Sequence, residues 1–379
     1  MKKMIFLLFF LAISVLISVS CSEEGTLSDI GIVNDIINDI ANDTANDIAN
    51  DIANDTEIKD TSICTPDCTN KFCGDGDGCG SKCTACQNSR EICNIDKWMC
   101  ERQKYKFIDI HSHIFKSDQD LNEISTFTTD NNIEYICLSG FYSDSSDINS
   151  DLDDKIISAS EKIDNIIPFL RGFLLTEQKS VQYVSQRLGT NKFKGIGELI
   201  VNGHGTRLGA DSPIMMDIYS LAGQYKVPVL IHFTFGSTNV NEPGGDEQVN
   251  QLKKALSQNP NTTIIVAHCG AGPAPHTSNY KDNLEMLLTN YPNLYFDIAG
   301  MHIDLYQNNT LTPLAEIIID VIKKYPDRFL VGFDFDDIMY PYENGTEIIQ
   351  YYENFLDNFE ITVSQKVAYD NAKKVLKLQ

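Results

Sequence analysis

Short apolar runs alternate with longer amphipathic stretches from residue 105 to the C-terminus. A short run of β-branched and aromatic residues predicts a buried strand, and an apolar position every third or fourth residue predicts a helix. Eight runs fit the strand pattern, at residues 106–111, 133–139, 166–174, 194–200, 227–233, 262–268, 294–299 and 328–334. Helices are predicted at residues 215–225, 249–258, 280–290, 313–325 and 363–376.

Eight strand–helix repeats are typical of a (β/α)8 TIM barrel, an α/β fold of roughly 250 residues. A doubly wound open sheet is the alternative for a chain that alternates strands and helices. No glycine-rich phosphate loop follows the first predicted strand, so we favour the barrel for residues 105–379.

The N-terminus has the pattern of an export signal. Lys2 and Lys3 precede an apolar run that ends at Val19, which predicts a secretory signal peptide over residues 1–20. Cys21 follows small residues, as in the lipobox of bacterial lipoproteins, and this predicts a lipid anchor on Cys21 in the cell envelope. If ordinary signal peptidase cuts the chain instead, the protein is free and secreted.

Two segments separate the signal from the predicted barrel. Residues 21–60 are acidic and of low complexity, with a four-residue Asn-Asp unit repeating from Asn34, which predicts a solvated tether. A helix with a narrow Ile/Ala ridge is the alternative for the tether. Residues 61–104 hold eight of the 11 cysteines and predict a small disulfide-rich module. A zinc site at Cys83 and Cys86 is the alternative there.

The charge excludes one class of partner. The chain carries 53 acidic and 30 basic side chains, for a formal net charge of -23. Such a surface repels polyanions, so we expect no nucleic-acid partner.

The histidines indicate the chemistry. All seven lie in the predicted barrel, at strand ends or in the loops that follow them, and active sites of such barrels form at the C-terminal ends of the strands. His111 and His113 are two residues apart, so both side chains leave the same face of one strand. The complete nitrogen and oxygen donor set suits zinc or a related divalent ion. It consists of His111, His113, Glu198, His232, His268 and Asp334.

These motifs resemble the amidohydrolase superfamily over nearly all of residues 105–379. The resemblance rests on Phe107–His113, Lys194–Glu198, Ile231–His232, Ala267–Gly270 and Gly332–Asp334. Residues 291–297 and 325–330 are further similar to the branch that includes amino-carboxymuconate-semialdehyde decarboxylase. Glu198 is instead similar to the bridging carboxylate of the TatD deoxyribonuclease-like hydrolases, so the resemblance leaves one or two ions open.

The resemblance also implies roles for individual residues. A divalent ion lowers the pKa of water to roughly 7, and Asp334 would take the proton from that water. His268 would bind a second ion or polarise the substrate carbonyl. Asp109 is expected to orient its strand. The candidates for binding a polar substrate are Arg171, His204, His276 and His302, and a loop residue without a function is the alternative for each.

Three functions are consistent with these features. The first is a metal-dependent hydrolase acting on a small-molecule amide, ester or lactone. The second is a non-oxidative metal-dependent decarboxylase, and the third is a non-catalytic exported binding protein. The filled ligand positions favour an enzyme, and Glu198 favours the hydrolase.

Overall fold

The structure is a computed structural model that describes residues 67–86, 91–115, 121–141, 150–201, 208–235, 245–271, 279–307, 310–336 and 342–379. The chain divides into two units, one up to Ala85 and one from Cys86 onward. The predicted signal peptide, the tether and Cys21 lie outside the described residues, and the predicted domain boundaries stay predictions. In the described ranges, no helix is both long and apolar enough to cross a membrane.

The cysteines in both units form disulfides. In the first unit Cys68 bonds to Cys83, and in the second Cys86 bonds to Cys100, which lies on the hairpin of β1 (Glu91–Asn94) and β2 (Met99–Arg102). Three further cysteines, Cys73, Cys79 and Cys93, are also disulfide-bonded. The disulfide prediction holds for these residues, and the zinc alternative is wrong because Cys83 and Cys86 each bond to another cysteine.

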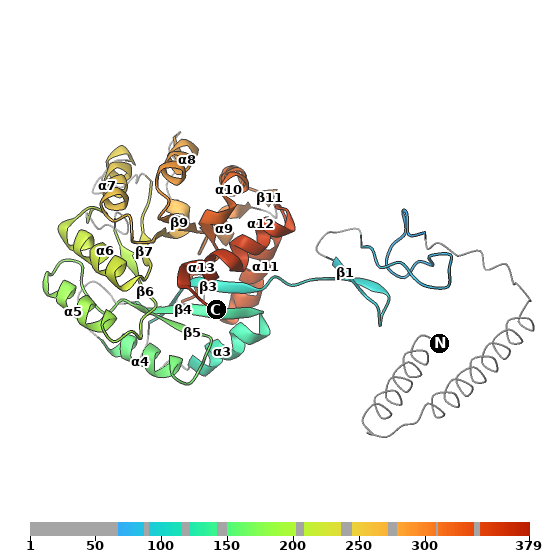
Figure 1. Ribbon diagram of the computed structural model, residues 1–379, viewed down its shortest axis with the longest axis horizontal. Coiled ribbons are helices and arrows are strands. Elements are labelled where there is room, and N and C mark those ends of the chain that lie inside the picture. Colours follow the sequence, from blue (N-terminus) through green and yellow to red (C-terminus); the bar gives the residue numbers. More distant parts are fainter. Residues whose placement is uncertain are drawn as a thin grey trace, which may run out of the picture. The chain divides into compact units, whose positions relative to one another are not determined.

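Eight parallel strands lie side by side in sequence order, as predicted. They are β3 (Phe107–Ile114), β4 (Ile133–Gly140), β5 (Ile166–Leu170), β6 (Gly195–Ile200), β7 (Val229–His232), β8 (Ile264–Val266), β9 (Leu294–Asp297) and β12 (Phe329–Leu330). The residues after β12 close the ring against β3, since Ile110 N donates to Val331 O at 3.1 Å and His113 N donates to Phe335 O at 2.8 Å. The fold is therefore a (β/α)8 barrel (Figure 1).

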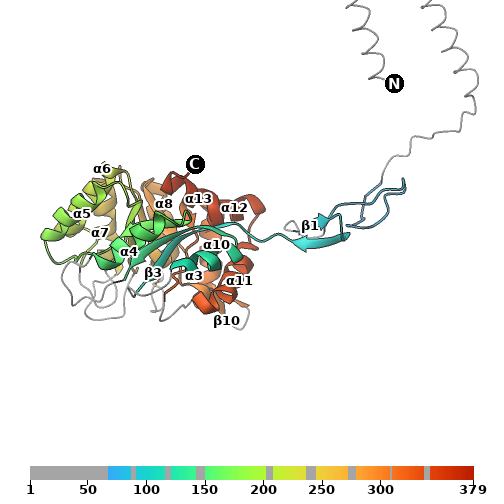
Figure 2. The same ribbon diagram turned by 90° about the horizontal axis from the view of Figure 1, so that it is seen from below.

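Helices surround the strands, as Figures 1 and 2 show from two directions. They are α3 (Leu121–Asp130), α4 (Asp151–Ser160), α5 (Lys179–Leu188), α6 (Pro213–Tyr225), α7 (Gly245–Gln258), α8 (Tyr280–Asn290), α10 (Pro313–Lys324) and α11 (Gly345–Leu356). Shorter elements follow some strands: the 3-10 turn η1 (Ala267–Gly270), α9 (His302–Leu305), the hairpin of β10 (Tyr306–Gln307) and β11 (Thr310–Leu311), and the 3-10 turns η2 (Pro326–Arg328) and η3 (Tyr342–Asn344). The chain ends with α12 (Ile361–Gln365), the π-helical η4 (Lys366–Asp370) and α13 (Asn371–Leu376).

Most predicted elements are confirmed, with corrections to one helix and to the ends of four strands. Residues 363–376 are helical, but α11 occupies the eighth helical position before them. The strands predicted at 166–174, 262–268, 294–299 and 328–334 end early, at Leu170, Val266, Asp297 and Leu330. After Val266 the chain turns, since His268 and Cys269 take left-handed backbone angles with φ of 54° and 52°. After Leu330 the N–H of Val331 donates to Val367 O in η4 instead of to a strand, and Asp334 further on has a left-handed φ of 56°.

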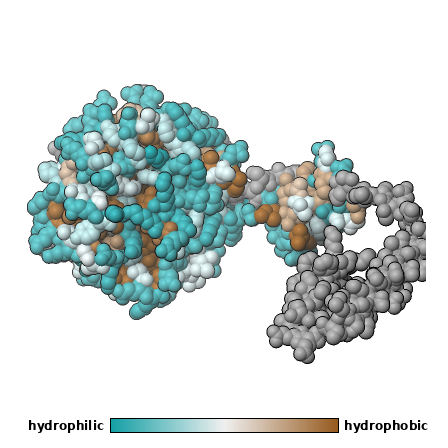
Figure 3. Space-filling model, in the orientation of Figure 1, coloured by the Kyte–Doolittle hydropathy of each residue, from teal (hydrophilic) through white to brown (hydrophobic). Residues whose placement is uncertain are grey.

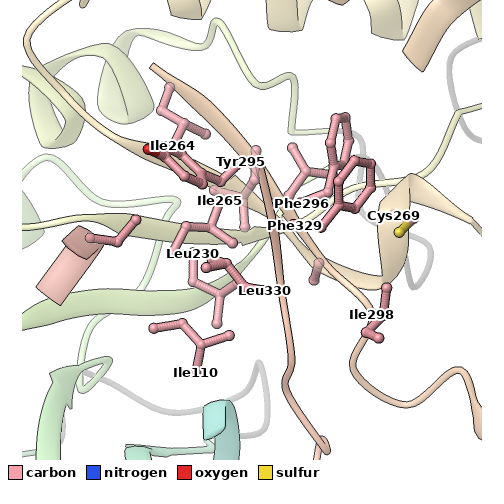
Figure 4. Close-up of a cluster of buried hydrophobic side chains, with 14 of the residues drawn as sticks. Ile110, Leu230, Ile264, Ile265, Cys269, Tyr295, Phe296, Ile298, Phe329 and Leu330 are labelled. Atoms are coloured by element: carbon pink, nitrogen blue, oxygen red, sulfur yellow. The ribbon is translucent and has the colours of Figure 1, made fainter. Parts of the chain in front are cut away.

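The barrel core consists of one large cluster of buried apolar residues and a smaller one around β4, α3 and α4. Parallel strands covered by helices are buried on both faces, which explains their near-continuous apolar sequences. Figure 4 shows part of this core, where Ile110, Leu230 and Leu330 gather from three strands, and the rings of Phe296 and Phe329 stack with centroids 5.9 Å apart. The face of the barrel visible in Figure 3 is mostly hydrophilic, with apolar residues scattered over it.

Candidate functional site

The structure brings all six predicted metal-binding side chains together at the C-terminal ends of the strands. Two histidines stand on β3, Glu198 on β6 and His232 at the end of β7, while His268 lies in η1 and Asp334 follows β12. The side chains of His111, His113 and Glu198 are between 0% and 5% exposed. Two triads have donor atoms within 4.8 Å of one another: His111, His113 and Asp334, and His111, Glu198 and His268.

The Glu198 carboxylate lies between two pairs of histidines. Its Oε2 is 3.6 Å from His111 Nε2 and 3.7 Å from His113 Nε2. Its Oε1 is 3.0 Å from His232 Nδ1 and 3.3 Å from His268 Nε2. Each oxygen therefore faces its own histidine pair.

Asp334 completes the first group. Its Oδ1 is 3.3 Å from His113 Nε2 and 3.5 Å from His111 Nε2. Its backbone N–H donates to His111 O at 2.7 Å, which fixes the residue against β3. A Cβ atom at Gly300 would lie 2.9 Å from Asp334 Oδ2, so glycine leaves the room that this carboxylate needs.

The hydrogen bonds of the histidines suit metal ligation. His268 Nδ1 lies 2.7 Å from Ala299 O, and because a carbonyl only accepts, Nδ1 carries a proton and Nε2 is the nitrogen that faces the site. His113 Nδ1 contacts Ser139 Oγ at 3.0 Å. The Nε2 atoms of His111 and His113 face each other at 3.1 Å, an arrangement that a shared proton or a cation must stabilise. The donor set thus fits a divalent ion.

The electrostatics agree with this fit. Burial lowers the pKa of His111, but the carboxylates of Glu198, Asp297 and Asp334 outweigh burial and raise it well above its usual value. Burial also lowers the pKa of His268, yet Glu198 and Asp334 raise it to about 9. Burial raises the pKa of Glu198, but His111 and His232 hold it well below its usual range. The site is therefore built for positive charge, which protons supply when no metal ion does.

Asp109 supports the strand that carries the histidine pair. Its Oδ1 accepts the backbone N–H groups of His111 and Phe333 at 3.0 Å and 3.1 Å, and its Oδ2 accepts the Ser112 hydroxyl at 2.5 Å. These contacts support the expectation that Asp109 orients β3 rather than binding metal.

The substrate candidates lie in different surroundings. Arg171 is buried just after β5, where its Nε donates to Glu198 O at 2.7 Å and its Nη1 donates to Phe173 O at 2.9 Å, so it supports the backbone of Glu198. His302 is buried at the start of α9, 6.2 Å from the ring of Tyr351. His204 and His276 lie outside the described residues. Substrate binding by all four stays a prediction.

Asp153 on α4 holds the backbone around Arg171. Its carboxylate accepts the N–H groups of Arg171 at 3.2 Å and Gly172 at 2.9 Å, and the Tyr183 hydroxyl at 3.0 Å. Burial raises its pKa from 3.8 to about 6, although these hydrogen bonds act to lower it. The folded protein therefore keeps this proton to a higher pH than the unfolded chain does.

We expect the contribution of Asp153 to the free energy of unfolding to fall as the pH rises from about 4 to about 6, since the unfolded chain loses its Asp153 proton first. A shift of this size corresponds to a change of about 3 kcal/mol. Urea unfolding of the wild type and Asp153→Asn, both with chelator, would show their stability difference changing across this window. Parallel pH curves for the two proteins would contradict the prediction.

Two aromatic residues form an apolar wall beside the site. Phe115 follows β3 and Phe141 follows β4, and their rings stack with centroids 4.7 Å apart. The Phe141 ring meets the His113 ring edge-on at 5.6 Å. Both phenylalanines are partly exposed, so they offer an apolar contact next to the histidine pair.

Comparison with known proteins decides the family. The family model described as Amidohydrolase matches residues 154–378, more than half of the chain. The chain belongs to the amidohydrolase family. The match includes Glu198, His232, His268 and Asp334 and begins after the β3 histidine pair. This amidohydrolase is therefore an enzyme of the superfamily, and the alternative of a non-catalytic binding protein is not supported.

Solved structures share the barrel at low sequence identity. 5-Carboxyvanillate decarboxylase from Sphingomonas paucimobilis is 12% identical with a TM-score of 0.52, and the match covers 73% of this amidohydrolase and 100% of that chain. A probable 2-pyrone-4,6-dicarboxylic acid hydrolase from Acinetobacter baumannii is 13% identical with a TM-score of 0.52, covering 72% and 100%. A dihydroxybenzoic acid decarboxylase from Polaromonas sp., with bound manganese and an inhibitor, is 14% identical with a TM-score of 0.51, covering 72% and 97%. No curated protein matches the sequence.

Sequence reasoning missed two residues of the site. Ser139 at the end of β4 contacts His113, and Asp297 at the end of β9 contacts His111 at 3.0 Å. The sequence could have indicated both residues in one way: each is a polar residue at the C-terminal end of a buried strand, where barrel active sites form.

Proposed function

We propose that this amidohydrolase is a metal-dependent hydrolase that acts on an amide, ester or lactone bond of a small molecule, with two divalent ions. The position of Glu198 carries the proposal, because each carboxylate oxygen faces a separate histidine pair. A carboxylate in that position suits a bridge between two ions. This feature also supports a likeness to the TatD-like hydrolases.

The residues divide into two groups. His111, His113 and Asp334 would hold one ion, and His232 and His268 would hold the other, with Glu198 between them. Bound divalent ions supply Lewis-acid polarisation of the scissile carbonyl and make water more acidic. Zinc suits this imidazole and carboxylate set best, and manganese is the alternative.

Asp334 is the proposed proton carrier. Although burial raises its pKa, the positive charge of His111, with further help from His113 and His268, holds it below its usual range, so the carboxylate is ionised at neutral pH. It would accept a proton from the attacking water at a carboxylate oxygen and deliver it to the leaving group. Phe115 and Phe141 would keep bulk water away from one side of the reaction.

A non-oxidative decarboxylase is the second candidate. It is supported by residues 291–297 and 325–330 and by the decarboxylases among the proteins of similar fold. In this function a single ion would orient the substrate. Glu198 would then orient a water molecule instead of bridging two ions.

We also propose that the protein is exported and lipid-anchored through Cys21. The support comes from the sequence of residues 1–21 and from the disulfides, which form in oxidising compartments.

The deciding experiment measures metal per chain by inductively coupled plasma mass spectrometry on protein purified without added metal or chelator. A panel of amides, esters and lactones, and of carboxylic acids assayed for carbon dioxide release, accompanies it. Two equivalents of zinc with bond hydrolysis is the expected result. One equivalent with carbon dioxide release favours the decarboxylase, and no metal after reconstitution contradicts both functions.

A further inference from the structure

Asp297 contacts both halves of the proposed metal site from one position. It is the last residue of β9 and is fully buried. Its Oδ2 lies 3.0 Å from His111 Nδ1. Its Oδ1 accepts the backbone N–H of His268 at 2.8 Å and that of Ala299 at 3.0 Å.

We propose that Asp297 is a positioning residue that sets the tautomer of His111 and holds the backbone turn that presents His268. It would thereby control one ligand in each half of the site without touching substrate or metal. This inference rests on the proposed metal site.

The tautomer argument follows from hydrogen-bond chemistry. An ionised carboxylate only accepts hydrogen bonds, so the proton in the contact between Asp297 and His111 belongs to Nδ1. A neutral imidazole has a single N–H, and its Nε2 then carries a lone pair. That lone pair points to the side where His113, Glu198 and Asp334 lie within 3.1 to 3.6 Å of Nε2. Asp297 thus selects the form of His111 that can bind a metal ion.

The backbone argument concerns the turn after β8. His268 and Cys269 both have left-handed backbone angles, which are unfavourable for residues other than glycine. Because Asp297 Oδ1 accepts the His268 N–H, the carboxylate helps to offset this cost. The side chain of His268 is held by the same stretch, since its Nδ1 donates to Ala299 O at 2.7 Å.

Close packing keeps these contacts in place. A Cβ atom at Gly332 would lie 2.8 Å from His111 Cβ and 2.9 Å from Ala299 Cβ, so the three chain segments meet without spare room. His111 therefore cannot easily move away from β9. A substitution at Asp297 would change which ring nitrogen of His111 carries the proton and would leave the position of the ring unchanged.

The substitution Asp297→Asn tests this inference because it keeps the shape and changes only the donor pattern. The Asn oxygen would stay with the two backbone N–H donors, which places the NH2 group against His111 Nδ1. Since that NH2 group only donates, Nδ1 must become the acceptor, and the proton moves to Nε2, where it blocks metal binding. We expect a folded protein whose metal affinity is about 10- to 100-fold weaker, measured by competition with a chelator.

Glu353→Gln is the matched control. It also removes a buried carboxylate that accepts a backbone N–H group, from Tyr105 at 3.4 Å, but its described hydrogen bonds include none of the histidines. We expect it to keep wild-type metal affinity. Equal affinity for Asp297→Asn and the wild type would overturn the inference, whereas a wild type that binds no metal would overturn the proposed function instead.

A second measurement applies if Asp297→Asn does not fold. The ¹⁵N chemical shifts of His111 in the metal-loaded wild type distinguish its two ring nitrogens. A protonated Nδ1 with a metal-bound Nε2 supports the inference, and the reverse assignment overturns it.

Discussion

The substitution Asp334→Asn is expected to lower kcat by about two to four orders of magnitude, the range typical of a lost general acid or base. Asparagine tolerates the left-handed angle of residue 334 and keeps the backbone hydrogen bond to His111 O, so the fold should survive. Its amide cannot take a proton from water at neutral pH. Steady-state kinetics on the substrate found in the panel would measure the loss.

Metal content separates the two roles of Asp334. If the variant keeps both ions and loses kcat, the carboxylate acts mainly in proton transfer. If kcat falls in proportion to metal, Asp334 acts mainly as a ligand. A kcat within tenfold of the wild type, with full metal content, would contradict the assignment of Asp334 as the proton carrier.

The substitution Glu198→Gln is expected to reduce the metal content from two equivalents to one. Glutamine keeps the size of the side chain but replaces one oxygen with a nitrogen that only donates, so one histidine pair loses its shared carboxylate oxygen. The affinity of that histidine pair for its ion is expected to fall by roughly 100-fold or more, because removing even a hydrogen-bond partner of a metal ligand can cost that much. Elemental analysis and titration with zinc would measure both effects.

Glu353→Gln is a suitable control for that experiment. Glu353 is also a buried carboxylate, and it accepts the backbone N–H of Tyr105 at 3.4 Å. We expect this variant to keep two equivalents. If Glu198→Gln also keeps two equivalents, then Glu198 does not bridge the ions. A wild type that itself binds a single ion would instead support the one-ion function.

The strands were predictable because a closed parallel barrel buries both faces of each one. This leaves continuous apolar runs such as Ile166–Leu170, which are visible without any structure. Four of the longer helices, α3, α4, α5 and α11, were not predicted, nor was the single turn of α9. One of them, α3, contains three threonines, and another, α4, begins with three acidic residues among its first four, so composition obscured their apolar faces.

The ligand set was predictable because strand ends converge in this fold, but its geometry was not. The chain at Gly197, directly before Glu198, has φ of +119° and passes so close to β7 that a Cβ there would lie 2.2 Å from Leu230 O, a local conformation that the sequence does not show. The role of Asp297 could not be predicted either. Nothing in the sequence shows that the end of β9 lies against the ring of His111.

The closure of the barrel links the site to the global stability of the protein. Asp334 lies in the segment after β12 that closes the barrel against β3. Its backbone N–H donates to the carbonyl of His111, a proposed metal ligand. A local opening that exposed this site would also break the seam of the barrel. We therefore expect the amides of His113 and Asp334 to exchange with solvent only when the whole domain unfolds.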